Sequence, residues 1–363
     1  MIKISLPVRT VTSLEYNREL ALEIEKSIFA DSYNKENVKN GIHSVHVTLP
    51  GNSDKRISIR CKHSDKTDSR SVFFVEESNY LSEGMVFHVN IKVDDSVIKE
   101  TAACVSSFIR KVGEGRIRIG KNTTLGCGKC VCENIQLETE MPSPAFSILA
   151  DALSPDDSSN WIKADIYTSK DYCDRIEADA YTKDGILIRN NENRLYQNGK
   201  EKSGEIELPY VVDEKKRPII PASTWKGIFR HATSEWVNYK RADSFVIDKM
   251  FGNRNKGIKG CLVFYDSIIQ DPEINKSTRV QIDKFSASIM NGTFKESIYV
   301  EGSFTIRIEC LESIEPYKEY IYLVLRDLHN GRINVGADKG IGRGFVTIKS
   351  IRQKISGGLE KIY

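Results

Sequence analysis

The sequence predicts an α+β protein in which a helix-covered antiparallel sheet is built twice, in two similar modules. The chain has 363 residues, enough for about two domains with a core each. Runs of alternating apolar residues, typical of strands, are separated by amphipathic helical runs. A glycine-rich segment, RIRIGKNTTLGCG at residues 116–128, returns without a gap as RINVGADKGIGRG at residues 332–344. A segment repeated with the same glycine spacing and the same flanks indicates a duplicated module.

The first module begins with a strand, MIKISLPV. Residues 14–30 are predicted as a helix, because apolar residues recur every four positions from Tyr16 to Ile28. VHVTL and RISIRC alternate like paired strands joined by PGNSDK, and MVFHVNIKV is a further strand. A second helix at residues 97–111, the glycine segment and a last strand follow. This βαββαβ order with one extra strand predicts a ferredoxin-like (RRM-like) sheet.

A linker is predicted at residues 141–160, MPSPAFSILADALSPDDSSN, because prolines, serines and acids break the pattern there. The first, divergent module is therefore residues 1–140 and the second is residues 161–363. The fold class predicted for the whole chain is α+β, with tandem ferredoxin-like modules, antiparallel sheets and inserted loops.

The second module is expected to open with the strand WIKADIYT. A polar stretch from about 170 to 205 is predicted as a long loop. A helix at about 223–241, the strands CLVFYDSII and SFTIRIEC, and a helix at 316–330 lead to the second glycine segment.

The charge balance excludes any case for nucleic-acid binding from bulk charge, because 53 basic residues face 50 acidic ones. Such a case must rest on where the cations gather. No run approaches the roughly 18 apolar residues of a membrane span, and no export signal is recognised, so we expect a cytoplasmic protein with reduced cysteines and no membrane partner. CGKCVC, from Cys127 to Cys132, supplies half of a zinc site, but no second CxxC or CxxH completes it. No metal is therefore predicted.

The most informative segment is RPIIPASTWKGIFRHA, residues 217–232. Its two prolines force extended backbone before a helix, and Ser223 is a natural N-cap. The open N–H groups of that first turn and the helix dipole favour an anion. Lys226 and Arg230 follow on one face, and Thr233 is expected beside them. A buried stripe is expected on the neighbouring face: Trp225, Phe229, Ala232 and Trp236.

The second glycine segment carries Lys339 and Arg343 among small residues whose N–H groups can approach a phosphate closely. Two simpler interpretations stay open: the glycines only permit a tight turn, and the cations of both segments form solvated basic faces. A nucleotide-binding GK[ST] loop is excluded, because a strand and not a helix follows the glycines.

Four blocks carry a family resemblance: IIPASTWKGIFR (219–230), FG…GCLVFYDS (251–267), TRVQIDKFSAS with the loop after it (278–301), and GADKGIGRGFV. In this order they resemble the RAMP superfamily, the RRM-like subunits of CRISPR–Cas effector complexes, and most closely a type III (Csm or Cmr) subunit. The resemblance covers residues 161–351, whereas the first module matches only in its glycine segment and element order. It implies partners: a CRISPR guide RNA, target RNA and other type III effector subunits.

The resemblance implies that basic residues hold the RNA backbone. Arginine suits bidentate phosphate binding and lysine acts as a point charge. The candidate RNA-binding residues are Lys226, Arg230, Lys339, Arg343, Arg279, Lys284, Lys121 and Lys129.

Catalysis by this chain has less support. Target-cleaving relatives carry an Asp before the proline-flanked segment, where this sequence has Glu207, with Asp213 nearby. Glu207 and Asp213 are the candidate catalytic residues, and solvated loop acids are the alternative. We expect an RNA-binding subunit without its own catalysis, or an endoribonuclease needing Mg²⁺ if it does cleave target RNA; no other cofactor is expected.

Two other functions stay open. CRISPR RNA-processing endoribonucleases also have tandem ferredoxin-like folds and often use histidine as general acid and base, for which His43 and His46 are the candidates. An RRM-like scaffold that binds no nucleic acid is the third, and the cations of the glycine segments argue against it.

Overall fold

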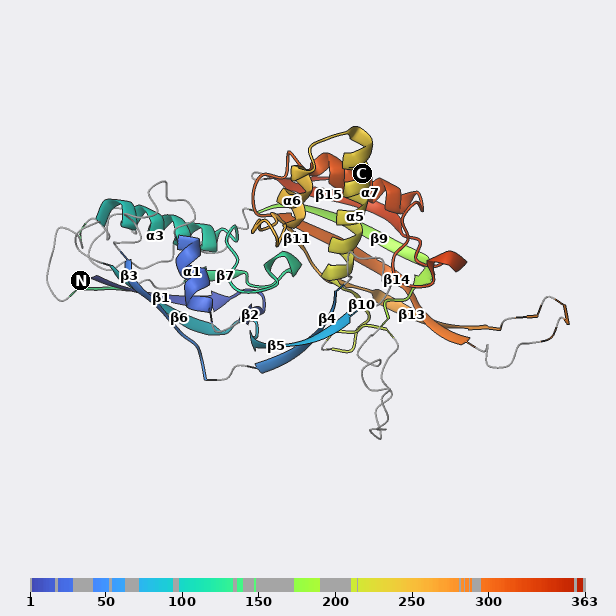
Figure 1. The fold of residues 1–363 in the computed structure, drawn as a ribbon, viewed down its shortest axis with the longest axis horizontal. Helices are drawn as coiled ribbons and strands as arrows, with labels where there is room; N and C mark the ends of the chain where they lie inside the picture. The colour runs from blue at the N-terminus through green and yellow to red at the C-terminus, as the bar shows by residue number, and fades with distance from the viewer. Residues whose placement is uncertain are drawn as a thin grey trace. The chain divides into compact units, whose positions relative to one another are not determined.

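The computed structural model divides the chain into two compact units, Met1–Cys173 and Asp174–Tyr363, called unit 1 and unit 2 (Figure 1). It describes residues 2–16, 19–28, 42–51, 54–62, 72–93, 98–132, 136–139, 147, 173–189, 210–213, 215–280, 282–283, 285–286, 288, 295–355 and 358–361. The predicted linker at 141–160 lies outside these residues except for position 147, and so does the predicted strand WIKADIYT. No helix of the described part is long and apolar enough to cross a membrane.

Unit 1 has a central antiparallel sheet with strand order β3-β6-β1-β7, and β8 also pairs with β1. A separate small sheet has the order β2-β5-β4. Apolar residues of β1, β6, α1 and α3 form one core. The elements are β1 (Ile2–Thr10), β2 (Leu14–Tyr16), α1 (Leu20–Ile28), β3 (Ile42–Thr48), β4 (Asp54–Lys62), β5 (Val72–Leu81), β6 (Val86–Val93), α3 (Ile98–Gly113), β7 (Cys130–Cys132) and β8 (Gln136–Thr139).

Two predictions for unit 1 are wrong. The helix predicted at 14–30 begins only at Leu20, because Leu14 to Tyr16 pair with β5 as the strand β2. The predicted pair VHVTL and RISIRC does not pair internally, since β3 lies against β6 and β4 lies against β5. In both cases the pairing with another strand decides the outcome rather than the local pattern.

Unit 2 has a larger antiparallel sheet with order β11-β14-β9-β15-β16, and β13 extends from it by pairing with β14. Figure 1 shows α5 and α7 lying across one face of this sheet, where α5 packs on β11 and α7 packs on β15. The elements are β9 (Asp174–Ile186), β10 (Ile219–Ile220), α5 (Ala222–Lys240), α6 (Phe245–Phe251), β11 (Leu262–Phe264), β12 (Ser267–Ile268), β13 (Gln270–Arg279), β14 (Lys295–Cys310), α7 (Lys318–His329), β15 (Thr347–Ile355) and β16 (Gly358–Lys361).

The central strand β9 lies where the sequence predicted a loop from about 170 to 205. Ile176, Ala178 and Ala180 are buried and face the core, while the intervening positions carry charged or polar side chains. Two alanines give a weak apolar signal, and this is why the strand was missed. It forms because β14 and β15 pair with it on both sides.

The two glycine segments have the same backbone conformation. We call residues 116–128 the first glycine loop and residues 332–344 the second. Gly120 and Gly336 both have φ of 86°, and the residues two positions later, Asn122 and Asp338, are left-handed with φ of 55° and 60°. A short 3₁₀ turn follows in each loop, Thr123–Leu125 and Lys339–Ile341. Each loop joins a helix, α3 or α7, to the strand after it.

The hydrogen bonds of the loops repeat as well. Ile119 N–H donates to the Gly128 carbonyl over 2.9 Å, and Val335 N–H donates to the Gly344 carbonyl over 2.8 Å. A Cβ on Gly344 would stand 2.1 Å from the Val335 oxygen, and one on Gly128 would stand 1.9 Å from the Ile119 oxygen. Only glycine fits at these two positions, because the chain approaches itself closely and φ is positive. The internal repeat predicted from the sequence is therefore a repeat of backbone geometry.

Candidate nucleic-acid interface

The helix α5 begins at Ala222, with Pro221 as its N-cap. Ser223, which we expected to cap it, lies inside the first turn, so that prediction is wrong. The Ala222 N–H donates to the Asp266 carboxylate over 2.7 Å. The negative charge expected at the start of this helix is therefore supplied by the chain itself, because Asp266 occupies the place that the N–H groups and the dipole favour.

One face of α5 is buried, as the sequence predicted for most of its members. Trp225 and Phe229 have no exposed surface, and they pack against Phe304 and Phe264 with ring centroids 5.9 and 5.4 Å apart. Thr233 is also fully buried, although we expected it beside the cations. It belongs to the buried stripe because it follows Phe229 by four residues, one turn along the same face.

Lys226 and Arg230 lie on the remaining surface of α5. Lys226 is half-buried, and burial, followed by the charge of Arg230, lowers the pKa of its ammonium to about 8. Arg230 is exposed and donates one hydrogen bond to the Gly252 carbonyl over 3.2 Å. A guanidinium has five N–H donors in a planar fork, so this bond fixes its position and leaves it able to bind an anion.

The second glycine loop presents the other two cations. Lys339 is exposed on its 3₁₀ turn. Arg343 is half-buried and donates to the Asp184 carbonyl over 2.9 Å, and its guanidinium carbon lies 3.6 Å from the centroid of the Tyr299 ring. The loop therefore carries one exposed lysine and one arginine that is held in a fixed orientation.

Backbone hydrogen bonds bring this loop and the start of α5 to the same end of the sheet. Ala337 N–H donates to the Leu187 carbonyl over 2.7 Å, just beyond the end of β9. The next carbonyl, of Ile188, accepts from Val211 N–H over 3.0 Å. The Val211 carbonyl in turn accepts from Ile219 N–H over 3.1 Å, three residues before α5. Two segments more than a hundred residues apart are thus joined through one short ladder.

The cations of the first glycine loop are less open. Lys121 is half-buried, and Lys129 is buried, with 9% of its surface exposed. The positions equivalent to Lys339 and Arg343 are Thr123 and Cys127. The repeated backbone therefore carries different side chains, and the second loop presents its cations more openly.

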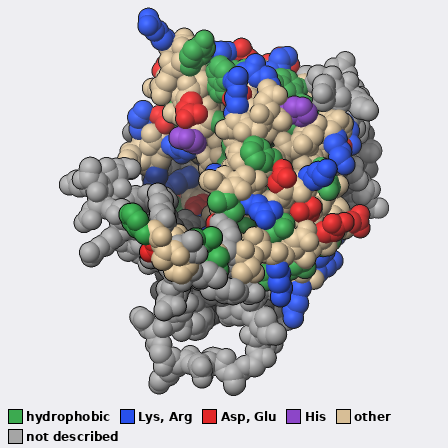
Figure 2. All heavy atoms as spheres, turned by 90° about the vertical axis from the view of Figure 1, so that its right-hand side faces the viewer, with side chains coloured by type: hydrophobic (Ala, Val, Ile, Leu, Met, Phe, Trp, Pro, Cys, Tyr) green, Lys and Arg blue, Asp and Glu red, His purple; other side chains and the backbone are tan. Residues whose placement is uncertain are grey.

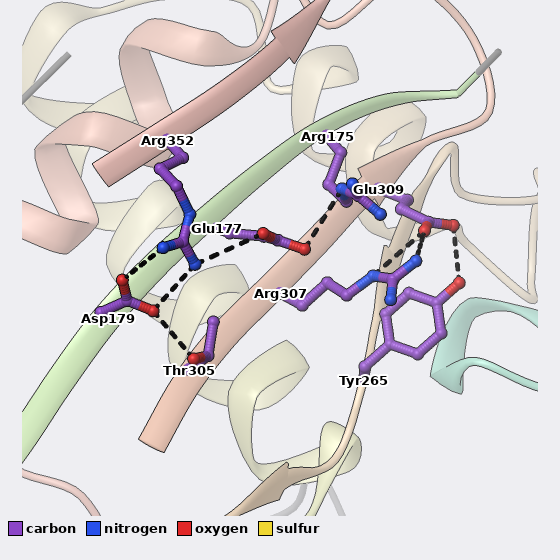
Figure 3. Close-up of polar contacts among 8 residues, drawn as sticks. All are labelled: Arg175, Glu177, Asp179, Tyr265, Thr305, Arg307, Glu309 and Arg352. Carbon is purple, nitrogen blue, oxygen red and sulfur yellow. Dashed lines mark hydrogen bonds and ion pairs between the residues drawn. The ribbon is translucent and has the colours of Figure 1, made fainter. Parts of the chain in front are cut away.

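The sheet face opposite the helices is occupied by ion pairs (Figure 3). Arg352 bridges Asp179 and Glu177, at 2.8 and 3.5 Å. Glu309 has no exposed surface and is held by Arg307 and by the Tyr265 hydroxyl, the latter over 2.6 Å. RRM-like sheets bind RNA by stacking bases on aromatic residues of this face. Among the described residues of this face, carboxylates pair with Arg307 and Arg352 and so neutralise much of their charge.

Lysine and arginine side chains are interspersed with acids over the surface, as Figure 2 shows for one face. This agrees with the nearly balanced composition and leaves the local groups of cations to carry any interaction with an anion.

A family model described as the RAMP superfamily matches residues 162–347, which is more than half of the chain. The chain belongs to the RAMP superfamily. Among solved structures, a chain in the cryo-EM structure of the type III-B Cmr-beta bound to cognate target RNA matches with 17% identity and a TM-score of 0.35. That match covers 51% of this chain and 62%, less than two thirds, of the other. No curated protein matches.

The RAMP match includes the position of Glu207, but Glu207 lies outside the described residues, as does Lys284. Arg279 ends β13 opposite Lys295, and its side chain is not among those described. The catalytic role of Glu207 and the RNA contacts of Arg279 and Lys284 stay predictions.

Asp213, the second candidate acid of this RAMP chain, lies in a turn closed by Arg217. Its carboxylate accepts from the Arg217 backbone and Nε, both over 2.8 Å, and from the Lys215 N–H over 3.0 Å. Burial raises the pKa of Asp213, but the hydrogen bonds from Arg217 outweigh it and hold the pKa below its usual range. Asp213 is thus an ionised acid already engaged in holding its turn.

The cysteines near the first glycine loop are poor metal ligands as they stand. Burial raises the pKa of Cys132 to about 12, and that of Cys130 further, whereas metals bind the thiolate. Among the described residues, no three His, Cys, Asp or Glu side chains are grouped to hold a metal ion.

His43 and His46 are both exposed on the edge strand β3 of unit 1.

Two residues that position α5 and Arg343 in this RAMP chain carry no local sequence signal. Asp266 lies within the FYDS block, and Tyr299 lies in the segment after TRVQIDKFSAS. Both act through contacts with segments far along the chain, Asp266 with Ala222 and Tyr299 with Arg343. The only available signal was that FYDS follows the helix segment in the family's order of blocks.

Proposed function

We propose that this chain is a guide-RNA-binding RAMP subunit of a type III CRISPR–Cas antiviral effector complex. The observation that carries the proposal is membership of the RAMP superfamily over residues 162–347, together with the four blocks that resemble type III subunits in their order. Its partners are the guide RNA, the target RNA and other effector subunits, in the cytoplasm.

We also propose that both units are ferredoxin-like. In each, the sheet elements follow the order strand, helix, two strands, helix, strand, as β1, α1, β3, β6, α3, β7 and as β9, α5, β11, β14, α7, β15. If those strands are numbered one to four, both sheets have the order 2-3-1-4, with antiparallel neighbours. The repeated glycine loop before the last strand supports the same conclusion.

The RNA backbone is bound by Lys226 and Arg230 on α5 and by Lys339 and Arg343 on the second glycine loop, and a short ladder of backbone hydrogen bonds joins this loop to the start of α5. Each cation that contacts a phosphate displaces condensed counterions, so binding weakens as salt rises. The further candidate RNA contacts are Arg279 and Lys284 in unit 2, and Lys121 and Lys129 in unit 1.

The subunit does not cleave RNA by itself under this proposal. Asp213 is engaged by Arg217, and Glu207 has one methylene more than the Asp of cleaving relatives, a change that misplaces a metal-orienting group by about 1 Å. If cleavage does occur, Mg²⁺ is the cofactor it needs.

The test compares the full chain with a fourfold variant, Lys226→Ala, Arg230→Ala, Lys339→Ala and Arg343→Ala, in binding single-stranded RNA over a series of salt concentrations. The matched control removes two lysines and two arginines that are exposed elsewhere: Lys26, Lys249, Arg110 and Arg326. The first variant should bind more weakly and lose about 0.7 of logarithmic salt slope per contact removed, and the control should not. Equal losses in both variants, or none in either with the fold intact, would remove the proposed surface.

The second candidate function, an RNA-processing endoribonuclease, is favoured by one observation. His43 and His46 are exposed, so a substrate can reach both. This function requires metal-independent cutting of repeat RNA. Substitution of the Arg or Lys residues should weaken the cutting, and only His43→Ala or His46→Ala should abolish it. EDTA-resistant cutting at one position of the repeat would establish it in place of the guide-binding role. If the chain binds neither guide RNA nor repeat RNA, it is instead an RRM-like scaffold that binds no nucleic acid.

A further inference from the structure

Arg343 lies on an aromatic ring in the second glycine loop, and this changes what the residue is suited to bind. Its guanidinium carbon is 3.6 Å from the centroid of Tyr299, which is the separation of two stacked planes rather than of an edge contact. The hydrogen bond from Arg343 Nη1 to the Asp184 carbonyl, at 2.9 Å, holds the guanidinium in one orientation.

The ring beneath Arg343 is itself fixed by the backbone. Tyr299 packs against Gly185 so closely that a Cβ on that glycine would stand 2.1 Å from the ring. Gly185 also has φ of 70°, a conformation that residues with a side chain rarely adopt. Its carbonyl accepts the Gly344 N–H over 3.0 Å, next to Arg343 in the chain. The Tyr299 ring is thus in contact with both Gly185 and Arg343.

The first glycine loop shows that the repeated backbone does not require an arginine stacked on a tyrosine. Ser13 takes the place of Gly185, because its carbonyl accepts the Gly128 N–H over 2.8 Å in the same way. Cys127 takes the place of Arg343, and its sulfur lies 3.9 Å from the Ser13 hydroxyl. In the first loop, two small side chains therefore occupy these positions of the same backbone. The stack of arginine on tyrosine is found in the second loop and is not required by the backbone.

A guanidinium stacked on a ring keeps a second planar face, and unpaired bases stack on arginine planes as they do on aromatic rings. We propose that Arg343, supported by Tyr299 and Gly185, is a stacking platform for one unpaired nucleobase of the bound RNA. This rests on the proposed RNA-binding function and refines it: Lys339 contacts phosphate alone, while the charge of Arg343 favours the backbone and its plane also contacts the face of a base. Because every base has a π-face, the platform is tolerant of sequence.

Arg343→Lys separates the two roles, since lysine keeps the charge and loses the plane. The probes are RNAs that carry a fluorescent adenine analogue at successive positions. In one arm the labelled RNA is a single-stranded guide alone. In the other arm the guide is annealed to a complementary target strand, and the target carries one unpaired analogue. Stacking quenches such an analogue. Full-length protein should quench it at one register, and the arm in which this occurs tells whether the base belongs to the guide or to the target.

Arg343→Lys and Tyr299→Leu should each abolish the quenching at saturating protein and weaken binding about fivefold or more, with the salt slope unchanged for Arg343→Lys. Tyr299→Phe, which keeps the ring, should behave as the unaltered protein. Lys339→Ala, the matched control, should reduce affinity and salt slope while the bound analogue stays quenched.

Full affinity and full quenching in Arg343→Lys would overturn the platform and leave Arg343 as a phosphate contact, with the proposed function intact. Failure of the unaltered protein to bind either RNA would instead remove the proposed function and the platform with it. Circular dichroism of each variant establishes that the fold is kept.

Discussion

The indole nitrogen of Trp225 donates a hydrogen bond over 2.9 Å to the hydroxyl of Ser267, and both residues are almost fully buried. The Ser267 hydroxyl in turn donates a hydrogen bond to the Thr305 carbonyl over 2.6 Å. The bond joins α5 to β12 and β14, and the adjacent Asp266 binds the start of the same helix. Two sequence blocks of the family, IPASTWKG and FYDS, thus act together to set the direction of the helix that carries Lys226 and Arg230.

We predict that Ser267→Ala lowers the free energy of unfolding of unit 2 by about 1–3 kcal/mol, because it leaves the buried Trp225 N–H without its acceptor. Chemical denaturation measured by far-UV circular dichroism gives this value. Ser223→Ala is the control, an exposed serine on the same helix. The bond has no such role if both substitutions cost the same, or if the Trp225→Phe and Ser267→Ala effects are simply additive.

Asp266→Ala should lower the stability by about 0.5–2 kcal/mol, as loss of a capping acceptor does. Asp266→Asn keeps an acceptor and loses the charge beside the helix dipole, so its cost should be smaller, about 0.3–1 kcal/mol. Thermal unfolding of the three proteins at low salt orders them. An asparagine variant as unstable as the alanine variant would show that the charge rather than the hydrogen bond is what matters.

RNA affinity should fall as pH rises from 7 to 9, because the pKa of Lys226 is lowered to about 8 by burial and by Arg230. A phosphate beside the ammonium raises that pKa again, so binding near pH 8.5 should take up a proton, which calorimetry in buffers of different ionisation enthalpy detects. Lys226→Arg, which does not titrate, should remove both effects. An unchanged pH profile in this variant would assign the titration to another group.

The same shift predicts the sign of a stability change. The pKa of Lys226 in the folded protein, about 8, lies below its ordinary value of 10.5, so the unfolded chain binds more protons between these two pH values. The contribution of Lys226 to the free energy of unfolding therefore increases with pH across this window and is constant below it. Comparison of the unaltered protein with Lys226→Met by denaturation at pH 7 and pH 9.5 isolates that contribution.

Gly344→Ala should destabilise the protein by more than about 1 kcal/mol, because φ is 81° and a Cβ would stand 2.1 Å from the Val335 oxygen. Gly340→Ala is the control in the same loop, since a Cβ there meets nothing within 4 Å. Gly128→Ala should repeat the loss in unit 1. Equal stability of the Gly344 and Gly340 variants would contradict the loop geometry.

Target RNA paired to the guide should not be cut by the purified subunit, with Mg²⁺ or with EDTA. Asp213→Asn should accordingly leave RNA binding unchanged, because the acid holds its own turn through Arg217. Should metal-dependent cutting appear, loss of it in Glu207→Ala or Asp213→Ala with binding retained would assign the catalytic role to those acids.

The sequence alone determined the features whose chemistry is local. Glycines recurring at positions that need positive φ identified both loops and their repetition, because few other residues adopt that conformation. The four-residue spacing of Trp225 and Phe229 identified the buried side of α5, because that spacing returns to one helix face. The four blocks between 219 and 346 identified the family.

The tertiary structure decided whatever depends on partners distant in the chain. Leu14 to Tyr16 are a strand because β5 pairs with them, and β9 forms between β14 and β15 despite its weak apolar signal. Asp266 caps a helix that begins 44 residues earlier, where the sequence offered Ser223. Arg343 rests on Tyr299, also 44 positions away, and so acquires a fixed plane that no local pattern predicts. Such contacts exist only once the chain is folded, because free energy gained by pairing and packing outweighs local preference.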